Sequence, residues 1–136
     1  MKIMIVIFMA IMFAGCSILG YRNVDGLKDN ATHVADFDAK RSSVLIYRDF
    51  LRYANARRNN PATGGYSDVN SELDRSTGNA YVTTLHDRRV IGHVEINHRD
   101  SNSAHVKAWW LIGSFYTDCS VRQTADPSLD CPVPKK

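Results

Sequence analysis

Apolar or small residues between positions 38 and 59 recur in pairs at the three-and-four spacing of one helical face. The pairs are Ser43-Val44, Ile46-Tyr47, Phe50-Leu51 and Tyr53-Ala54. The pattern predicts an amphipathic helix over residues 38–59, with Asp38 capping its amino end and Arg57 in its last turn, where each charge suits the helix dipole. Pro61 ends the helix. A buried strand over residues 43–48 is the alternative, but the paired pattern continues past the length of a strand.

From residue 80 the pattern changes to the β-branched, aromatic and alternating residues of strands. We expect strands over residues 80–86, 89–97 and 104–116, joined by turns at residues 87–88 and 99–103. Strands joined in this way form an antiparallel meander. The apolar residues of the middle strand are expected on one face, namely Val90, Val94 and Ile96. Its polar residues are expected on the other face, namely His93, Glu95 and Asn97.

The remaining segments carry little periodicity. Residues 17–36 are polar and contain glycines, which predicts a tether with a short strand near residues 33–37. Residues 60–79 are expected to form a loop with one short strand within residues 66–73. Residues 124–136 contain three prolines and are expected to form an irregular tail.

The length of 136 residues suits one domain with one hydrophobic core. We expect this domain over residues 37–136. Its predicted class is α+β, with one amphipathic helix packed on a small antiparallel β-meander.

The first 17 residues are a lysine-led apolar run that ends at a cysteine and a serine, MKIMIVIFMAIMFAGCS. The two residues before the cysteine are small, and Phe13 stands where Leu is usual. The run resembles the signal sequence of bacterial lipoproteins, in which the cysteine is lipidated and becomes the first residue after cleavage. The resemblance implies a cleaved signal peptide over residues 1–15, acylation of Cys16, and a lipidated tether over residues 16–36.

Three other interpretations compete for this run. An ordinary secretory signal requires small residues three and one before the cut, and Met12 is bulky. An uncleaved transmembrane helix is the stronger rival, because residues 3–20 carry no charge and approach the roughly 20 residues that span a bilayer. Small residues make the end of this run less hydrophobic, however, and no basic cluster follows it. A buried helix of a cytosolic protein rarely begins at residue 3 without polar positions.

Lipidation implies a place in the cell and a role for the other cysteines. Each buried methylene contributes about 0.8 kcal/mol, so several acyl chains on Cys16 would anchor the protein firmly in the lipid bilayer. Ser17, in place of the Asp that retains such lipoproteins at the inner membrane, implies the outer membrane of a Gram-negative cell, facing the periplasm or the surface. Cys119 and Cys131 then form an even pair in an oxidising compartment. Their predicted disulfide would hold the tail and stabilise the fold by about 3 kcal/mol.

Charge and motifs exclude several function classes. The net charge is +3, which is too small to indicate a nucleic-acid partner. The chain contains no P-loop, dinucleotide fingerprint, nucleophile elbow or CxxC pair. We therefore predict no catalytic residue and no cofactor.

One arrangement would contradict that prediction. On a strand, His93 and Glu95 project from the same face, and His86 or His105 lies on a neighbouring predicted strand. Three such ligands hold catalytic zinc, whose bound water hydrolyses amide bonds. The spacing matches no metal motif, and a solvated polar face explains the same residues.

Two groups of residues are candidates for partner binding. Arg41, Arg48 and Arg52 fall on one stripe of the predicted helix, suited to phosphates, carboxylates or an acidic partner, or simply to solvent. The adjacent Trp109 and Trp110 point to opposite sheet faces. One is expected beneath the helix, and the other is expected to be exposed or beneath the tail, where it would offer a protein contact.

The sequence thus predicts a membrane-anchored envelope lipoprotein that acts by binding an envelope protein or polymer, as an assembly, inhibition or exclusion factor. The first alternative is a small metal-assisted envelope hydrolase that uses His93 and Glu95. The second is a single-span membrane protein with the same domain.

Overall fold

The computed structural model describes residues 20–58, 68–111 and 116–131. Its centre is a five-stranded antiparallel sheet with the order β1-β5-β4-β3-β2. The strands are β1 (His33–Ala39), β2 (Asp68–Leu73), β3 (Ala80–His86), β4 (Arg89–Asp100) and β5 (Ser103–Trp110). The helices within the described residues are α2 (Val24–Asn30), α3 (Ser43–Arg57) and α4 (Asp118–Ala125). The predicted α+β class with an antiparallel sheet is confirmed.

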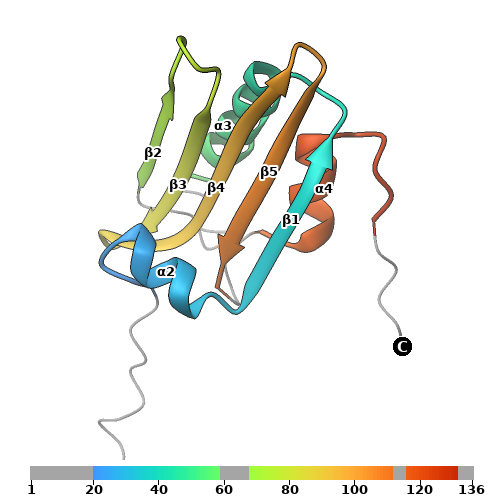
Figure 1. Cartoon of the computed structure of the whole chain (residues 1–136). Helices are drawn as coiled ribbons and strands as arrows, with labels where there is room; N and C mark the ends of the chain where they lie inside the picture. Colours follow the sequence, from blue (N-terminus) through green and yellow to red (C-terminus); the bar gives the residue numbers. More distant parts are fainter. Residues whose placement is uncertain (1–19, 59–67, 112–115, 132–136) are drawn as a thin grey trace, which may run out of the picture.

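The back face of the sheet carries the main core. Figure 1 shows α3 and α4 behind the sheet, with α4 near β1. At the predicted spacing, α3 buries Ile46, Phe50 and Ala54 against this face. Val121 and Ala125 of α4 are also fully buried there. Because each large apolar side chain contributes about 1.5–3 kcal/mol when fully buried, this layer supplies most of the stabilisation.

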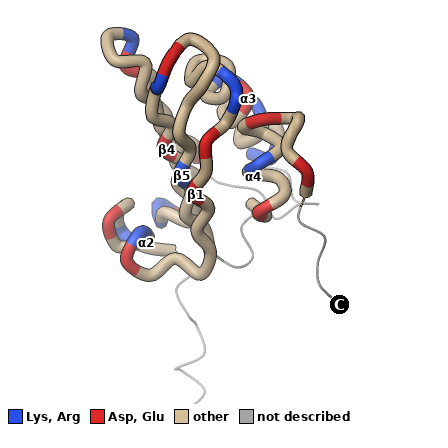
Figure 2. Tube along the Cα trace, turned by 45° about the vertical axis from the view of Figure 1, so that its right-hand side comes forward, with Lys and Arg blue, Asp and Glu red and all other residues tan. Residues whose placement is uncertain are grey.

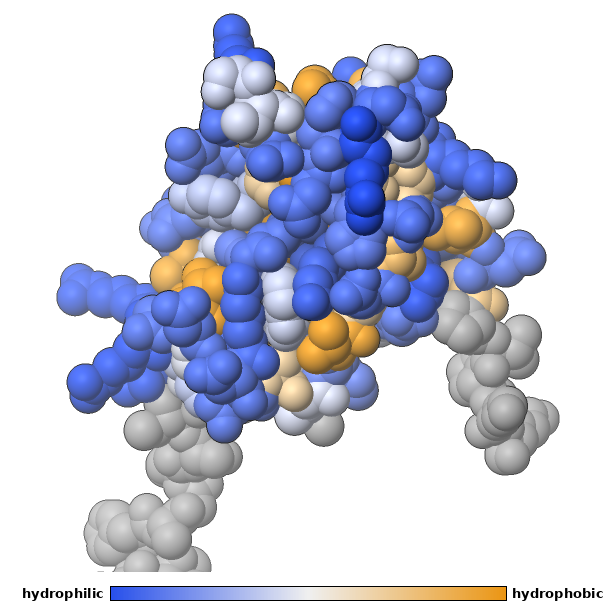
Figure 3. Space-filling view, in the orientation of Figure 1, coloured by the Kyte–Doolittle hydropathy of each residue, from blue (hydrophilic) through white to orange (hydrophobic). Residues whose placement is uncertain are grey.

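The front face is open except at one end, where α2 lies across it (Figure 1). Asn23 caps α2 by accepting a hydrogen bond from the backbone amide of Gly26 at 2.8 Å. Leu27 of α2 is fully buried against Val90 and Trp109, in a second and smaller apolar cluster. Most of the remaining front surface is hydrophilic (Figure 3).

A bulge in β4 determines which residues face α2. Thr84 pairs with Gly92, but the next residue, Leu85, pairs with Val90, so Ile91 is an extra residue on β4. One extra residue shifts the alternation of a strand. Ile91 therefore packs into the back core, and Val90 packs beneath α2 on the front.

The bulge corrects the predicted faces of this strand in one respect. Val94 and Ile96 lie in the back core as expected, but the expectation that Val90 joins them was wrong. The polar residues do line the front, namely His93, Glu95 and Asn97.

Several predicted boundaries also change. Asp38 lies in β1 rather than capping a helix, and α3 begins at Ser43. Its end at Arg57 is close to the prediction. β5 ends at Trp110, where the pairing with β1 stops, and residues 112–115 of the expected strand lie outside the described residues. The short strands expected near residues 33–37 and within residues 66–73 are present as β1 and β2.

The two ends of the domain are more ordered than expected. The prediction of a tether was wrong for residues 20–36, because this segment contains α2 and most of β1. The segment before the tail contains α4, which the sequence pattern did not reveal. Its amino end has a capping box in which Thr117 and Ser120 bond each other's backbone amides.

The predicted disulfide between Cys119 and Cys131 is present, with a Cα–Cα distance of 4.6 Å. It closes the loop that follows α4. In this loop the Asp126 carboxylate accepts a hydrogen bond from the backbone amide of Lys40 at 3.0 Å. The end of the described chain is thereby fixed to the end of β1.

Candidate functional site

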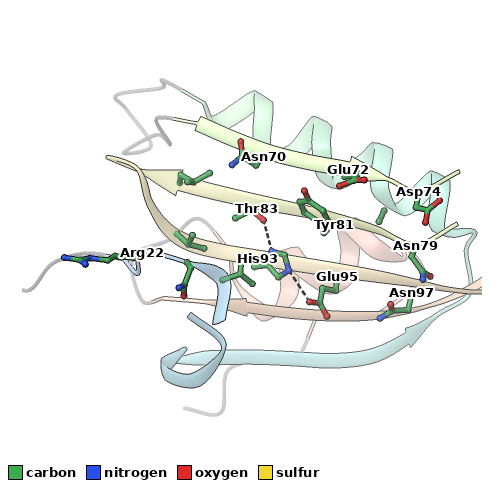
Figure 4. Close-up of a pocket in the computed structure, with 15 residues that line it drawn as sticks. Arg22, Asn70, Glu72, Asp74, Asn79, Tyr81, Thr83, His93, Glu95 and Asn97 are labelled. Carbon is green, nitrogen blue, oxygen red and sulfur yellow. Dashed lines mark hydrogen bonds and ion pairs between the residues drawn. The ribbon is translucent and has the colours of Figure 1, made fainter. Parts of the chain in front are cut away.

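A groove of about 730 Å³ lies on the front face over β2, β3 and β4, next to α2 (Figure 4). Amides and carboxylates make up much of its polar lining, and they are Asn70, Asn79, Asn97, Glu72, Asp74 and Glu95. Its end next to α2 is apolar, formed by Val24, Leu85 and Val90. The groove therefore combines an apolar end with polar side chains along its floor.

The strand register arranges the floor in rows across the sheet. In one row Glu72 stands opposite Tyr81, and Tyr81 stands opposite Glu95. In the next row Asn70 stands opposite Thr83, and Thr83 stands opposite His93. Directly opposed residues of antiparallel strands have their side chains on one face, about 5 Å apart. Each row thus brings together three side chains from three separate strands.

His93 lies at the centre of a hydrogen-bond chain and is only 5% exposed. Its Nδ1 lies 2.7 Å from Thr83 Oγ1, and its Nε2 lies 3.3 Å from Glu95 Oε1. Glu95 also forms an ion pair with Lys28 of α2. Figure 4 shows the bonds from His93 to Thr83 and to Glu95 as dashed lines. The chain joins three elements, because Thr83 is on β3, His93 and Glu95 are on β4, and Lys28 is on α2.

Burial and neighbouring charges determine the protonation states of His93 and Glu95. Burial lowers the pKa of His93, although the neighbouring Glu95 carboxylate opposes the shift. Burial also acts to raise the pKa of Glu95, but the hydrogen bond and charge of Lys28 outweigh it, so the pKa of Glu95 is lowered. An ionised Glu95 only accepts, so neutral His93 carries its hydrogen on Nε2. Its Nδ1 then accepts the Thr83 hydroxyl hydrogen.

Aromatic rings from the neighbouring strands lie beside His93. The His93 ring centroid lies 5.8 Å from that of Tyr81 and 6.0 Å from that of Trp109. Lys28 Nζ lies 4.6 Å from the Trp109 centroid, and Lys107 Nζ lies 5.5 Å from it, so both cations contact the ring. Burial and the charge of Glu72 raise the pKa of Tyr81, which therefore stays protonated at neutral pH.

Beside the groove, the half of the front face formed by β1 and β5 is neutralised internally. His105 contacts Asp36 through Nε2 and Asp38 through Nδ1, each at 2.7 Å. Lys107 lies 3.5 Å from Asp36, and Arg99 lies 3.9 Å from Asp38. Each carboxylate of this half thus has two basic partners.

The groove is different, because it contains more carboxylates than cations that pair with them. Over the whole fold, acidic and basic residues are interspersed (Figure 2). Lys28 pairs with Glu95, but within residues 20–58, 68–111 and 116–131 no basic side chain lies within ion-pair distance of Glu72 or Asp74. Hydrogen bonds from Ser76 lower the pKa of Asp74, which is therefore ionised. Even when Arg22, which also lines the groove, is counted with Lys28, three carboxylates face two cations, so the groove carries a net negative charge.

The structure brings His93 and Glu95 together, as the zinc-site alternative requires. Each of them, however, is already bonded to other protein groups. Both ring nitrogens of His93 are engaged, by Thr83 and by Glu95. His105 is held by Asp36 and Asp38 on the other half of the face. Among the described residues, no group of three or more His, Cys, Asp and Glu side chains is placed to hold a metal ion.

The three candidate arginines surround one carboxylate. Arg41 lies before α3, and its Nη2 donates to Asp49 Oδ2 at 2.7 Å, while its Nη1 donates to backbone carbonyls at the end of α4. The nearest nitrogens of Arg48 and Arg52 lie 3.7 Å from Asp49 Oδ1. Arg48 and Arg52 are exposed on α3, whereas Arg41 links α3 to α4.

The adjacent tryptophans face opposite sides of the sheet, as predicted. Trp110 lies in the back core, and Trp109 lies beneath α2 on the front. The expectation that the second tryptophan is exposed or lies beneath the tail was wrong, because Trp109 is only 7% exposed and is covered by α2. Trp110 is 3% exposed. Trp109 therefore supports the apolar end of the front face and presents little surface to a partner.

The residues that sequence reasoning missed are Glu72 and Tyr81, together with Lys28. Each lies in a segment predicted as loop, strand or tether without any chemical motif. Only the pairing register places Tyr81 between Glu72 and Glu95. Alternation on the strand over residues 80–86 was the one available signal, because it gives Tyr81 and Thr83 a common face.

Cys16 and the rest of the signal-like run lie outside the described residues. Within the described parts, no helix has the length and apolar character needed to cross a bilayer. Comparisons of the chain with protein-family models, with curated proteins and with solved structures found no match.

Proposed function

We propose that this protein is a bacterial envelope lipoprotein that acts by binding a polypeptide of the envelope in the groove on the front of its sheet. Acylated Cys16 anchors it, in a Gram-negative cell at the outer membrane, with the domain facing the periplasm or surface. The role is that of an assembly, inhibition or exclusion factor, without catalysis. The signal-like run of residues 1–17 supports the anchor.

The groove itself is the observation that carries the binding role. The back of the sheet is covered by α3 and α4, whereas the front is covered only at one end by α2 (Figure 1). The uncovered part is hollowed over about 730 Å³ and has an apolar end, amides and uncompensated carboxylates. A concave site with a few converging polar groups is the usual form of a binding site.

The geometry of the Thr83–His93–Glu95 chain favours binding over hydrolysis. Thr83 is 4% exposed, which leaves its hydroxyl poorly accessible to a substrate. β3 and β4 are each paired on both sides, so their backbone amides serve the sheet and do not form an oxyanion hole. The chain instead fixes the floor of the groove by joining β3, β4 and α2.

A photocrosslinking amino acid at two matched positions tests the binding role. Asn70 on β2 lines the groove, and Asn55 on α3 is exposed on the opposite side of the sheet. In cells, the Asn70 position is expected to yield one adduct of defined mass that Tyr81→Ala abolishes. The Asn55 position is expected to yield none. Equal adducts from both positions, or none from Asn70, would refute the proposal.

Labelling with radioactive palmitate tests the anchor separately. The full chain is expected to take up label, and Cys16→Ala is expected to lose it and to leave the membrane fraction. If Cys16→Ala stays in the membrane without label, the first residues form an uncleaved span. The groove would then act from a different anchor.

A further inference from the structure

We infer that Glu72, Tyr81 and Glu95 form a cradle for a single lysine or arginine side chain of the bound polypeptide. The inference deepens the proposed function and rests on it, since it names the chemistry of the partner. It arises from the row that the strand register builds across β2, β3 and β4.

The geometry of the row suits one cation. Tyr81 stands directly between Glu72 and Glu95, whose backbones are two strand spacings apart, roughly 10 Å. A cation above the Tyr81 ring is then within reach of both carboxylates. The π face of the ring attracts the same cation, and more strongly where water is partly excluded. Figure 4 shows these three side chains on neighbouring strands of the groove.

The charges of the row leave room for one positive group. Glu72 is exposed, and no basic side chain of the described residues lies within ion-pair distance of it. Glu95 is ionised but shared between Lys28 and His93. Two carboxylates and one ammonium leave a net charge of −1, which one lysine or arginine neutralises. The polar floor beyond the row supplies amides to bond the backbone of the partner.

The same row continues onto β5 and β1, where its charged side chains are already paired. Lys107 stands opposite Glu95, and Asp36 stands opposite Lys107. Lys107 Nζ lies 3.5 Å from Asp36, so this part of the row contains its own cation. The uncompensated charge is therefore confined to the end of the row at Glu72 and Tyr81. A polypeptide that follows the groove places its cationic side chain there.

Nuclear magnetic resonance of the full chain in detergent micelles provides the test, at about 0.1 M salt. The probes are the acetylated and amidated pentapeptide AAKAA, its norleucine analogue, which removes only the charged group, and chitotriose. AAKAA is expected to shift amide signals of β2 to β4 in a saturable manner, and the norleucine peptide is expected to bind at least roughly tenfold more weakly.

Matched variants of the protein localise the effect. Glu72→Gln is expected to weaken AAKAA binding roughly fivefold. Asp130→Asn, which removes the same charge at an exposed position after α4, is expected to leave it unchanged. Tyr81→Phe keeps the ring and is expected to retain binding, whereas Tyr81→Leu is expected to weaken it. An equal effect of Glu72→Gln and Asp130→Asn would mean general charge attraction and would overturn the cradle.

The other outcomes separate the cradle from the proposed function. Equal binding of the lysine and norleucine peptides overturns the cradle, while a groove-specific crosslink at Asn70 still supports binding. Shifts from chitotriose alone also overturn it and identify a glycan as the occupant. Selective binding of AAKAA without any crosslink in cells supports the cradle and refutes the proposed role.

Discussion

The two faces of the sheet are built from the same strands but differ in how much apolar surface they bury. Seventeen buried apolar residues of the described chain form the cluster on the back, under α3 and α4. Among the described residues, three are buried in the cluster on the front, under α2, namely Leu27, Val90 and Trp109. Most of the rest of the front is polar, and Glu72, Tyr81 and Glu95 form one of its rows. Stability is concentrated on one face, which leaves the other available for recognition.

The front face itself contains two kinds of polar surface. The half of the front over β1 and β5 pairs its own charges, through His105, Asp36 and Asp38. The half over β2, β3 and β4 does not, because Glu72 has no basic partner among the described residues. Charged side chains that pair with one another leave little net charge for a ligand. Unpaired charge over a groove favours a ligand of opposite charge.

The largest expected effect is on the back face. Phe50 is fully buried in α3, and Phe50→Ala is expected to lower the free energy of unfolding by about 3–5 kcal/mol, because it removes apolar contacts and leaves a cavity. Leu45→Ala on the same helix, at a residue 37% exposed, is the control and is expected to change stability by less than about 0.5 kcal/mol. Urea unfolding followed by circular dichroism measures both. Similar losses from the two variants would contradict this division of the helix.

The disulfide at the carboxyl end of the back layer comes next. It joins residues 12 positions apart, and replacing Cys119 and Cys131 together by serine is expected to lower the free energy of unfolding by about 3 kcal/mol on the chain-entropy model. Urea unfolding again gives the value. Iodoacetamide should label neither cysteine before reduction and both afterwards. Stoichiometric labelling of the unreduced protein would show that the pair is open.

The back face was also the part that could be predicted from sequence. Large apolar residues at regular spacing, such as Ile46 and Phe50 in α3 or Val94 and Ile96 in β4, give a strong periodic signal. β1, by contrast, buries only the small Ala35 and Ala39 fully, between charged outward residues. α4 likewise buries only Val121 and Ala125. Small buried side chains carry too little hydrophobic signal to distinguish an ordered element from a tether or tail.

The site was less predictable for a different reason. His93 and Glu95 lie two positions apart on one strand, so their common face follows from local alternation. Glu72, Tyr81 and Lys28 join them only through pairing between distant segments, and register is a property of the whole sheet. The bulge at Ile91 illustrates the same limit, because nothing in the alternating pattern marks one extra residue.

A smaller effect is expected where α2 covers the front. Leu27 is the only fully buried residue of α2, and Leu27→Ala is expected to lower stability by about 2 kcal/mol, because the helix can settle into the vacated space. Amide exchange should accelerate in α2 while α3 remains protected, and the emission of Trp109 should shift to the red. Asp29→Ala, at an exposed position of α2, is the control and should change neither measurement. Equal loss of protection in α2 and α3 would mean that both faces open as one unit.

The smallest effect concerns protonation beneath the groove. Burial lowers the pKa of His93 in the folded protein, whereas an unfolded histidine has a pKa of about 6.5. Between the two values the unfolded chain binds a proton that the folded chain does not. The His93 contribution to stability is therefore present above about pH 6.5 and is lost as the pH falls through the lowered pKa.

The free energy of unfolding, measured by urea titration between about pH 7.5 and 5, isolates this contribution. The decline toward acid pH should be less steep in His93→Gln than in the native chain, whatever the absolute stability of the variant. An identical slope would mean that His93 takes up a proton as readily in the folded state as in the unfolded one. The Thr83–His93–Glu95 chain would then tolerate charge at its centre, and a protonated His93 would offset the net charge of −1 that Glu72, Glu95 and Lys28 leave on the row. The row would then lose its attraction for a lysine or arginine side chain as the pH falls.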